Sequence, residues 1–593
     1  MQFKLSKIPE LVTNRQLLVV TLVVGVIVNV QLTIQHRDIS QALGDTDDAM
    51  RLVMMRALMH GTGWYDQLIV RLQPPVGTWM HWSRLLDGAL AAMTSVFHLF
   101  LPQEAAENLT RRVWPALWTF PAIGCAIWMA RRLAGGAAVV VAALIFATNL
   151  QVYEQFIPGR IDHHNVQIVM TLVAAVCTMA RVDRARWAIA AGIATGLGLT
   201  IGIEALPFQA LIGAAYGLRA AIDPDDAKTA RNYALALAGA TLGFFALATP
   251  PSRWPLSFCD ALGLNLIVAI LIASAGLIAL WAWGGRLSLR LRIGALAGLG
   301  VIAAGAYLSM HPACIRGPFA AVDPRLVPIW FNNIEELLSW PQLLRGQFTT
   351  AMATISASVL SVAGAIYLAW QTRRALDPAV LFALAATLMA AAMAEHAFRM
   401  QDYVFWLGFP TFAAAITVLG RQFAKNLLIP VGIAAIVLSP FVVGTALSKT
   451  IEAVQPKATD SNPHPHRDQC VNKPAYRRLA ALPPGIVAGD IDFGPFILAY
   501  TKDSVLAAPY HRMSFGIYAE HEAETGPADQ AEARMRALNV AYVVECPAYV
   551  LRGGPDSFQV KLQSGDTPPW LRLVSKPGEV LQVYEVLPPA RPR

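Results

Sequence analysis

Apolar stretches of about 20 residues recur along the chain from Gln16 to Lys449, and each is long enough to cross the ~30 Å hydrocarbon core of a bilayer. The chain is 55% hydrophobic and only 15% charged, whereas soluble domains carry roughly a quarter charged residues. We therefore predict a polytopic α-helical membrane protein. Its net charge of +8 is interpreted as a topology signal, with no nucleic-acid partner expected.

Clusters of basic residues orient the predicted spans, because cytoplasmic loops carry an excess of Lys and Arg. Lys4, Lys7 and Arg15 precede the first span, which lacks a small-residue cleavage site and is expected to remain as an anchor with a cytoplasmic N-terminus. Treating the later basic clusters as cytoplasmic gives about thirteen spans. These are expected near 17–35, 112–130, 135–150, 166–181, 187–204, 206–220, 233–249, 263–283, 293–310, 350–370, 378–394, 403–419 and 427–447.

This topology divides the chain into a transmembrane domain, 1–449, and a polar C-terminal domain, 450–593, on the outer side. Three loops, 36–111, 151–165 and 311–349, lie on the same side as that domain. The apolar stretch 85–101 contains Asp87 and His98 and is short for a span, so we expect an interfacial helix there.

Acidic side chains and imidazoles gather in these outer loops. The first loop contains "DTDDAMRLVMMRALMHG" with Asp47 and Asp48, the second contains the triplet from Asp162 to His164, and the third contains Glu336 within "FNNIEELLSW". Oxygen and nitrogen ligands from three loops on one membrane face are suited to a divalent cation. Each feature also has a simpler interpretation: a helix N-cap, an interfacial His pair or a solvated loop charge.

Short motifs in the same order along the chain resemble the catalytic subunit of oligosaccharyltransferase and its archaeal and bacterial single-subunit relatives, which have the GT-C glycosyltransferase fold. "DDAMRLVMMRALMHG" is similar to the first-loop segment whose acid binds metal, with Asp48 as the best match, and "GRIDHHNVQ" is similar to the Asp-x-Asp/Glu/His motif. That second match implies metal-ligand roles for Asp162 and His164. "NIEE" points in the same way to Glu336 as a ligand, and "FRMQDYVFWLGFP" points to Arg399 as the donor-phosphate contact.

The resemblance implies a GT-C fold with about 13 transmembrane helices and a C-terminal α/β periplasmic domain in the bacterial inner membrane. The expected donor is a sugar linked to polyprenyl phosphate or pyrophosphate, held among membrane lipids. The expected cofactor is Mg²⁺ or Mn²⁺, which would stabilise the charge on the leaving group. Asp48 would act as the base and Arg399 would bind the phosphate.

The C-terminal domain departs from the family. No "WW" pair occurs, and Asp492, Phe493 and Gly494 stand where the Asp-Tyr-Gly of a Trp-Trp-Asp-Tyr-Gly motif is expected. We therefore expect a glycan or glycolipid acceptor rather than a sequon, with oligosaccharyltransferase activity on protein, or a transporter or flippase with Glu204 as an ion site, as alternatives. Candidate acceptor-side residues are Asp47, His163, Asp492, His511 and Arg512.

Four of the six cysteines fall outside the predicted spans, where disulfides persist in an oxidising compartment. Three pairings of these four are possible. We favour Cys259 with Cys314 and Cys470 with Cys546.

Overall fold

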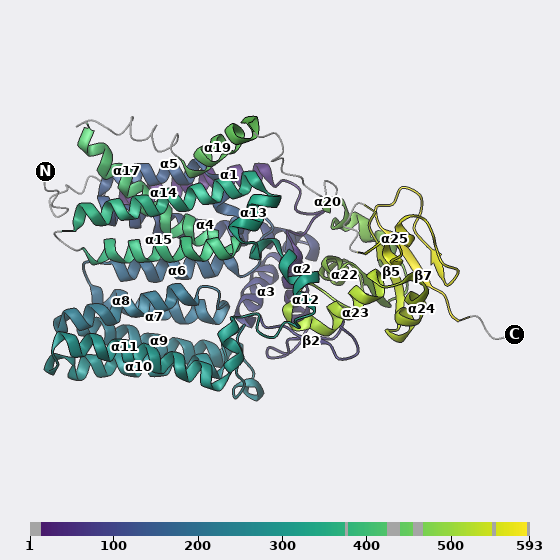
Figure 1. Ribbon diagram of the computed structural model, residues 1–593, viewed down its shortest axis with the longest axis horizontal. Coiled ribbons are helices and arrows are strands. Elements are labelled where there is room, and N and C mark those ends of the chain that lie inside the picture. Colours follow the sequence, from purple (N-terminus) through teal and green to yellow (C-terminus); the bar gives the residue numbers. More distant parts are fainter. Residues whose placement is uncertain (1–12, 374–376, 424–438, 455–466, 548–552, 590–593) are drawn as a thin grey trace.

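The computed structural model describes residues 13–373, 377–423, 439–454, 467–547 and 553–589. Long helices form one bundle in which most lie side by side (Figure 1). They are α1 (Asn14–Gln35), α4 (Gln103–Ala134), α5 (Gly136–Thr148), α6 (His164–Met179), α7 (Arg184–Ile201), α8 (Leu206–Ile222), α9 (Ala227–Ala248), α10 (Leu264–Trp283), α11 (Leu289–Met310), α14 (Phe348–Thr372), α15 (Pro378–His396), α17 (Phe409–Phe423) and α19 (Pro440–Val454).

The apolar surface of this bundle identifies a multi-pass membrane protein, as predicted. Seven of the described helices are long and apolar enough to cross a membrane, and α5 with the bent helix η2 (Leu150–Phe156) adds an eighth candidate. The best 18-residue window of α11 has none of its residues buried, although its mean hydropathy is 1.8. Such a surface is stable only in an apolar solvent.

A helix is found at each predicted span up to 403–419, so the helices lie where the sequence predicts them. The last predicted span, 427–447, lies mostly outside the described residues, and α19 begins within it and continues past the domain boundary placed at 449. The total of thirteen spans therefore stays a prediction.

Glycines allow the helices α7 and α9 to pack closely. A Cβ at Gly192 of α7 would come within 2.6 Å of the Tyr233 carbonyl oxygen on α9, and one at Gly196 would come within 2.9 Å of Ala240. Glycine at both positions lets the two backbones approach, which is a common device for packing helices in membranes.

Three of the basic residues used for the predicted topology, Arg131, Arg132 and Arg181, lie at one end of the bundle. At that end Arg131 of α4 donates to Asn14 at the start of α1 (2.7 Å), while Arg132 and Arg181 both contact Asp377 before α15 (2.9 and 2.8 Å). The outer loops and the C-terminal domain lie at the opposite end (Figure 1). These three arginines thus lie at the end of the bundle away from the three loops, which is compatible with a common side for the loops.

Short helices and strands build the loop layer between the bundle and the C-terminal domain. The predicted interfacial segment forms α3 (Arg84–His98), which packs on α2 (Thr46–Met59) and α4. The same layer contains β1 (Leu68–Ile69), β2 (Thr78–Trp79), η6 (Pro312–Arg316), α12 (Leu326–Ile329), η7 (Phe331–Asn333), η8 (Glu335–Leu337) and α13 (Trp340–Gly346). Between α15 and α17 the chain forms η9 (Phe398–Met400), α16 (Gln401–Tyr403) and η10 (Val404–Gly408).

The C-terminal domain is an α/β unit, as predicted. Its five strands are ordered β4-β3-β5-β7-β6, with parallel pairing of β3 to β4 and β5 and antiparallel pairing of β7 to β5 and β6. The strands are β3 (Ile486–Gly489), β4 (Ser504–Val505), β5 (Val540–Glu545), β6 (Leu571–Leu573) and β7 (Gln582–Val586), and the main helices are α22 (Gly494–Tyr500), α23 (Ser514–Thr525), α24 (Ala528–Ala537) and α25 (Phe558–Gln563).

A shared hydrophobic core fixes this domain to the loop layer. Leu52 and Met54 of α2 belong to the same buried cluster as Phe496 of α22 and Tyr510. Arg56 of α2 also donates to the carbonyl oxygen of Ala499 (2.6 Å). The outer loops and the C-terminal domain therefore form one packed unit above the bundle.

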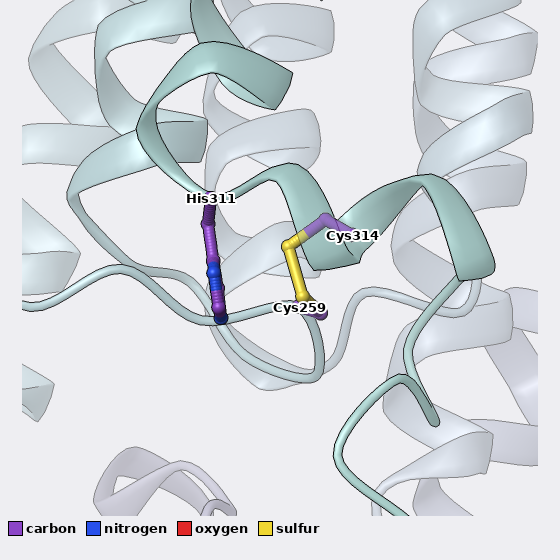
Figure 2. Close-up of side chains that lie close together, drawn as sticks. All are labelled: Cys259, His311 and Cys314. Atoms are coloured by element: carbon purple, nitrogen blue, oxygen red, sulfur yellow. A yellow bond between two sulfur atoms is a disulfide. The ribbon is translucent and has the colours of Figure 1, made fainter.

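Two disulfides occur in this unit, in the pairing that the sequence favours: Cys259–Cys314 and Cys470–Cys546. Figure 2 shows the first of them, with His311 beside it. Because both sulfurs are bonded to each other, these three residues are not available together as metal ligands.

Candidate active site

A cavity of about 1890 Å³ opens where the helix bundle meets the loop layer and the C-terminal domain. Its wall brings together segments that are far apart in sequence. Charged or polar residues that line it include Asp47, Glu154, Arg160, His163, Glu204, Glu335, Glu336, Arg399 and Asp492. A volume of this size is larger than an ordinary small-molecule pocket and suits an extended substrate.

Of the two adjacent acids in the first loop, Asp47 faces the cavity and Asp48 does not. Asp48 is fully buried, and its Oδ1 accepts hydrogen bonds from the backbone amides of Ile161 (2.7 Å) and Asp162 (3.0 Å). Its Oδ2 lies 3.4 Å from Arg160 Nη1. The carboxylate favoured by the sequence motif therefore holds the second loop in place, and the structure points to Asp47 for a role in the cavity.

The rotation of α2 explains this arrangement. Asp45 is the N-cap of α2 and accepts from the amide of Asp48 (2.9 Å), so the helix begins one residue before Asp47. Successive helical residues point about 100° apart, which separates Asp47 from Asp48. Partial burial raises the pKa of Asp47 to about 8, with Asp162 and Glu336 adding to the increase.

The triplet Asp162, His163 and His164 lies at the start of α6, with all three side chains buried. Asp162 Oδ1 lies 2.6 Å from His163 Nδ1, and Asp162 Oδ2 lies 3.0 Å from His164 Nε2. Burial by itself would raise the pKa of Asp162, but the two imidazoles and Arg51 hold it well below its ordinary value. Asp162 is therefore an anion at neutral pH.

Glu204 joins this group, which the sequence did not indicate. It lies in the turn between α7 and α8, and its carboxylate is 3.1 Å from His163 Nε2 and 3.6 Å from Arg399 Nη1. The only available signal was an acid inside the apolar stretch "GIEALPF", which suggested an ion site of a transporter. The structure instead places it with the triplet at the loop end of the bundle.

Arg399 and Glu336 complete the cluster. Arg399 lies in η9, directly after α15, and its Nη2 is 3.1 Å from Glu336 Oε2 in the third loop. The same nitrogen contacts His164 Nε2, and burial together with the Arg399 charge lowers the pKa of His164. The structure thus brings Asp162, His164, Glu336 and Arg399 together, as the sequence analysis expects.

Buried Arg51 supports the cluster from behind. Its Nη1 is 2.7 Å from Asp87 of α3, its Nη2 is 4.0 Å from Asp162, and its guanidinium stacks 4.6 Å from the Trp82 ring centre. Because all of these groups are buried, the ion pair fixes α2, α3 and the triplet relative to one another.

The side chains of the triplet fit a divalent cation. One carboxylate oxygen and two imidazole nitrogens lie within 4.8 Å of one another. Asp162 Oδ2, although buried, accepts no hydrogen bond among the residues that the structure describes. Buried polar atoms without partners are uncommon, and here the free atom is a hard oxygen of the kind that Mg²⁺ and Mn²⁺ prefer.

Three of the predicted acceptor-side residues come from the C-terminal domain. Asp492 follows β3, where its amide donates to Asp490 (2.9 Å), and it lines the cavity. His511 and Arg512 contact Asp260 of the loop between α9 and α10 instead of the triplet. Asp492 and His511 therefore line another part of the same wall, and Arg512 contacts that wall through Asp260.

No family model matches the chain, and no curated protein matches it in sequence. Its fold is nevertheless similar to that of an archaeal oligosaccharyltransferase, AglB from Archaeoglobus fulgidus, solved with an inhibitory peptide and a dolichol-phosphate. The TM-score is 0.68 at 14% identity, over 90% of this chain and 69% of that one.

Two further structures of the Archaeoglobus fulgidus enzyme match in the same way. One is tethered by a disulfide to an acceptor peptide with an Asn-Val-Thr sequon, at a TM-score of 0.66 and 14% identity over 90% of this chain and 69% of that one. The other contains zinc and sulfate, at a TM-score of 0.60 and 15% identity over 89% and 68%. From the helix bundle, the outer-loop layer and the C-terminal α/β domain, the chain has the GT-C fold of these membrane glycosyltransferases.

Proposed function

We propose that the protein is a membrane glycosyltransferase that takes a sugar from a polyprenyl-phosphate- or pyrophosphate-linked donor and transfers it to a glycan or glycolipid. The observation that carries this proposal is the convergence of Asp47, His163, Glu204, Glu336 and Arg399 on one cavity at the end of a membrane bundle. Paired acids beside a guanidinium at a lipid boundary suit a reaction in which a phosphate leaves and a hydroxyl attacks.

Arg399 is positioned to bind the donor phosphate. It stands at the start of the apolar segment Phe398–Gln422, so a headgroup bound there leaves its prenyl tail beside the membrane helices. The planar guanidinium presents parallel N–H donors that match two phosphate oxygens. In the free protein Glu204 and Glu336 occupy these donors, and a bound phosphate would replace at least one of them.

Asp47 is positioned to take the proton of the acceptor. An acceptor hydroxyl attacks the anomeric carbon and forms the new glycosidic bond while its proton moves to the Asp47 carboxylate. The bond between the anomeric carbon and the phosphate oxygen breaks, and its electron pair stays on the polyprenyl phosphate. Asp48, held by two backbone amides, keeps Asp162 in place.

Asp162, His163 and His164 would hold a divalent cation, Mg²⁺ or Mn²⁺, which when bound supplies positive charge for the leaving phosphate. Glu204 orients His163 through the hydrogen bond to Nε2, so the ring is fixed by a second carboxylate. Glu336 forms an ion pair with Arg399 and therefore positions the guanidinium that would bind the phosphate.

We also propose that the site faces the periplasm of a bacterial inner membrane, and two features support this orientation. The basic residues gather at the opposite end of the bundle, as expected for a cytoplasmic face. Both disulfides lie at the end that contains the cavity, which supports an oxidising compartment there.

A protein acceptor is the second candidate, favoured by the similarity of the whole fold to an oligosaccharyltransferase. The junction after β3 counts against it, because Asp490 and Ile491 stand in the place of the expected Trp pair. A transporter or flippase is less well supported, since Glu204 pairs with His163 and Arg399 at one end of the bundle.

The acceptor class is tested with purified protein in nanodiscs, a polyprenyl-phosphate-linked sugar and Mg²⁺. Parallel reactions receive a membrane glycolipid extract, or an Asn-Val-Thr peptide with its Gln-Val-Thr control. We expect mass spectrometry to show a sugar added to a glycolipid. Efficient transfer to the Asn peptide and none to its control would instead establish the protein acceptor.

A further inference from the structure

A second group of side chains with metal-ligand chemistry lies on the cavity wall, apart from the triplet. His81 follows β2, Asp260 lies between α9 and α10, and His511 belongs to η13 (His511–Met513) of the C-terminal domain. One possible ligand atom from each lies within 4.8 Å of those of the other two. Segments this far apart in sequence meet here through the tertiary fold alone.

The contacts within the group are close and leave one nitrogen without a partner. His511 Nε2 is 2.7 Å from Asp260 Oδ2, and the rings of His81 and His511 are 4.6 Å apart between centres. His81 Nδ1 is buried and has no hydrogen-bond partner within the described parts of the chain. An imidazole nitrogen in that situation loses its hydration without compensation unless something binds it.

The carboxylate of the group is held rigidly. Arg512 Nε and Nη2 bind the two oxygens of Asp260 at 2.6 and 2.8 Å, which leaves a lone pair of Oδ2 directed at His511. The neighbouring Cys259 is bonded to Cys314, so the loop that carries Asp260 is fixed to η6 (Figure 2). Partners of this kind, which orient a ligand without touching the ion, are typical of metal sites.

We propose that His81, Asp260 and His511 bind a transition-metal ion of the Zn²⁺ class. Two neutral imidazoles and one carboxylate are a common ligand set for zinc, and three protein ligands leave its fourth tetrahedral position open. Ligand atoms around tetrahedral zinc stand about 3.3 Å apart, given metal–ligand distances of about 2.0 Å. The ion therefore replaces the hydrogen between His511 and Asp260 with small side-chain movements, while Arg512 keeps its place.

This ion would join three parts of the wall. His81 comes from the first loop, Asp260 from the loop tied by the disulfide, and His511 from the C-terminal domain. All three line the cavity, so the open position is accessible to water or to an oxygen of the acceptor. The site therefore fixes the C-terminal domain over the cavity, and it is distinct from the triplet that is proposed to serve the donor.

The test counts bound metal on the full-length protein in detergent, after exposure to Zn²⁺ or Co²⁺ and removal of excess ion. We compare wild type with His81→Ala, His81→Gln and Asp260→Asn. His521→Ala is the matched control, because His521 lines the same cavity outside the group. Asp162→Asn removes the triplet site, and the visible absorption of Co²⁺ reports coordination geometry.

We expect Asp162→Asn to keep one equivalent of metal with a tetrahedral Co²⁺ spectrum and His521→Ala to keep the wild-type metal content. The His81 and Asp260 variants should each bind one equivalent less than wild type and lose the tetrahedral spectrum. Equal metal content and spectra in wild type and both His81 variants would overturn the proposal and leave an ion-pair contact among His511, Asp260 and Arg512. If the His81 variants fail to fold, the comparison of wild type with Asp162→Asn decides. The absence of a tightly bound ion in folded Asp162→Asn would then overturn the proposed site.

Discussion

Replacing Asp47 and Asp48 one at a time by Asn distinguishes the group that faces the substrate from the group that supports the loop. Asn at position 47 has nearly the same shape but cannot accept a proton, so the acceptor hydroxyl loses its base. Asn at position 48 keeps an Oδ1 that can still accept from the amides of Ile161 and Asp162. It places an amide group near Arg160 instead of a carboxylate.

The expected magnitudes differ. Loss of a positioned base lowers kcat roughly 10²- to 10⁴-fold, with little change in the KM for the donor, which Arg399 contacts. The Asp48 variant loses the charge-assisted contact with Arg160 at 3.4 Å. Arg160 still keeps its ion pair with Asp45 and its 2.7 Å hydrogen bond to Gln155. That change costs about 1–3 kcal/mol of local stability and lowers kcat far less than the Asp47 change.

The assay is initial-rate transfer of a radiolabelled sugar from a polyprenyl-phosphate donor in nanodiscs, with folding checked by size-exclusion chromatography. Thr46→Ala, next to the pair on α2, is the matched control and should keep near-wild-type rates. A folded Asp48→Asn protein without activity, beside an active Asp47→Asn protein, would refute the role of Asp47 as the base and restore Asp48, the residue favoured by the sequence motif.

Three further outcomes are expected. Arg399→Ala should raise the donor concentration needed for half-maximal rate, and Arg399→Lys should restore it only in part, because an ammonium lacks the two-pronged contact; unchanged donor dependence in both variants would place the phosphate elsewhere. Chelation by EDTA should abolish turnover, and Mg²⁺ or Mn²⁺ should restore it. Full turnover in chelator would contradict the assignment of a required cation to the triplet. Burial raises the pKa of Glu545 from 4.5 to about 7, so the native state keeps a proton that the unfolded state releases. Stability near β5 should therefore be greatest below about pH 4.5 and fall by about 3 kcal/mol as the pH rises to 7, at about 1.4 kcal/mol per unit. Hydrogen exchange of β5 amides, corrected for intrinsic rates, should show this dependence in wild type and lose it in Glu545→Gln; equal slopes would contradict it.

The sequence predicts the membrane fold well because lipid imposes a simple rule on it. Apolar length and basic clusters predict where helices run and which ends share a side. That shared side groups Asp162, His164 and Glu336, and the resemblance to the oligosaccharyltransferase motifs added Arg399 and the role of each residue. Asp162, His164 and Arg399 lie next to helix ends that the spans already fix, whereas Glu336 comes from the middle of the third loop.

What the sequence could not provide was the rotation and packing of the short elements. Whether Asp47 or Asp48 faces the cavity depends on the residue at which α2 begins, and one position changes the direction by about 100°. Glu204 and Asp260 lie in loops whose neighbours are determined by how the helices pack, including the close approach of α7 and α9. No periodicity in the chain encodes those contacts.

We propose above that a lipid-linked sugar donor is cleaved in the cavity beside Arg399. The most direct measurement follows a defined polyprenyl-phosphate sugar by mass spectrometry in nanodiscs that contain acceptor glycolipid and either wild type or Asp162→Asn. We expect wild type to convert the donor to free polyprenyl phosphate with a matching gain of glycosylated acceptor, and the variant to leave the donor intact. If wild type instead leaves the donor intact in proteoliposomes and moves it across the bilayer, cleavage at this site is contradicted and a flippase is indicated.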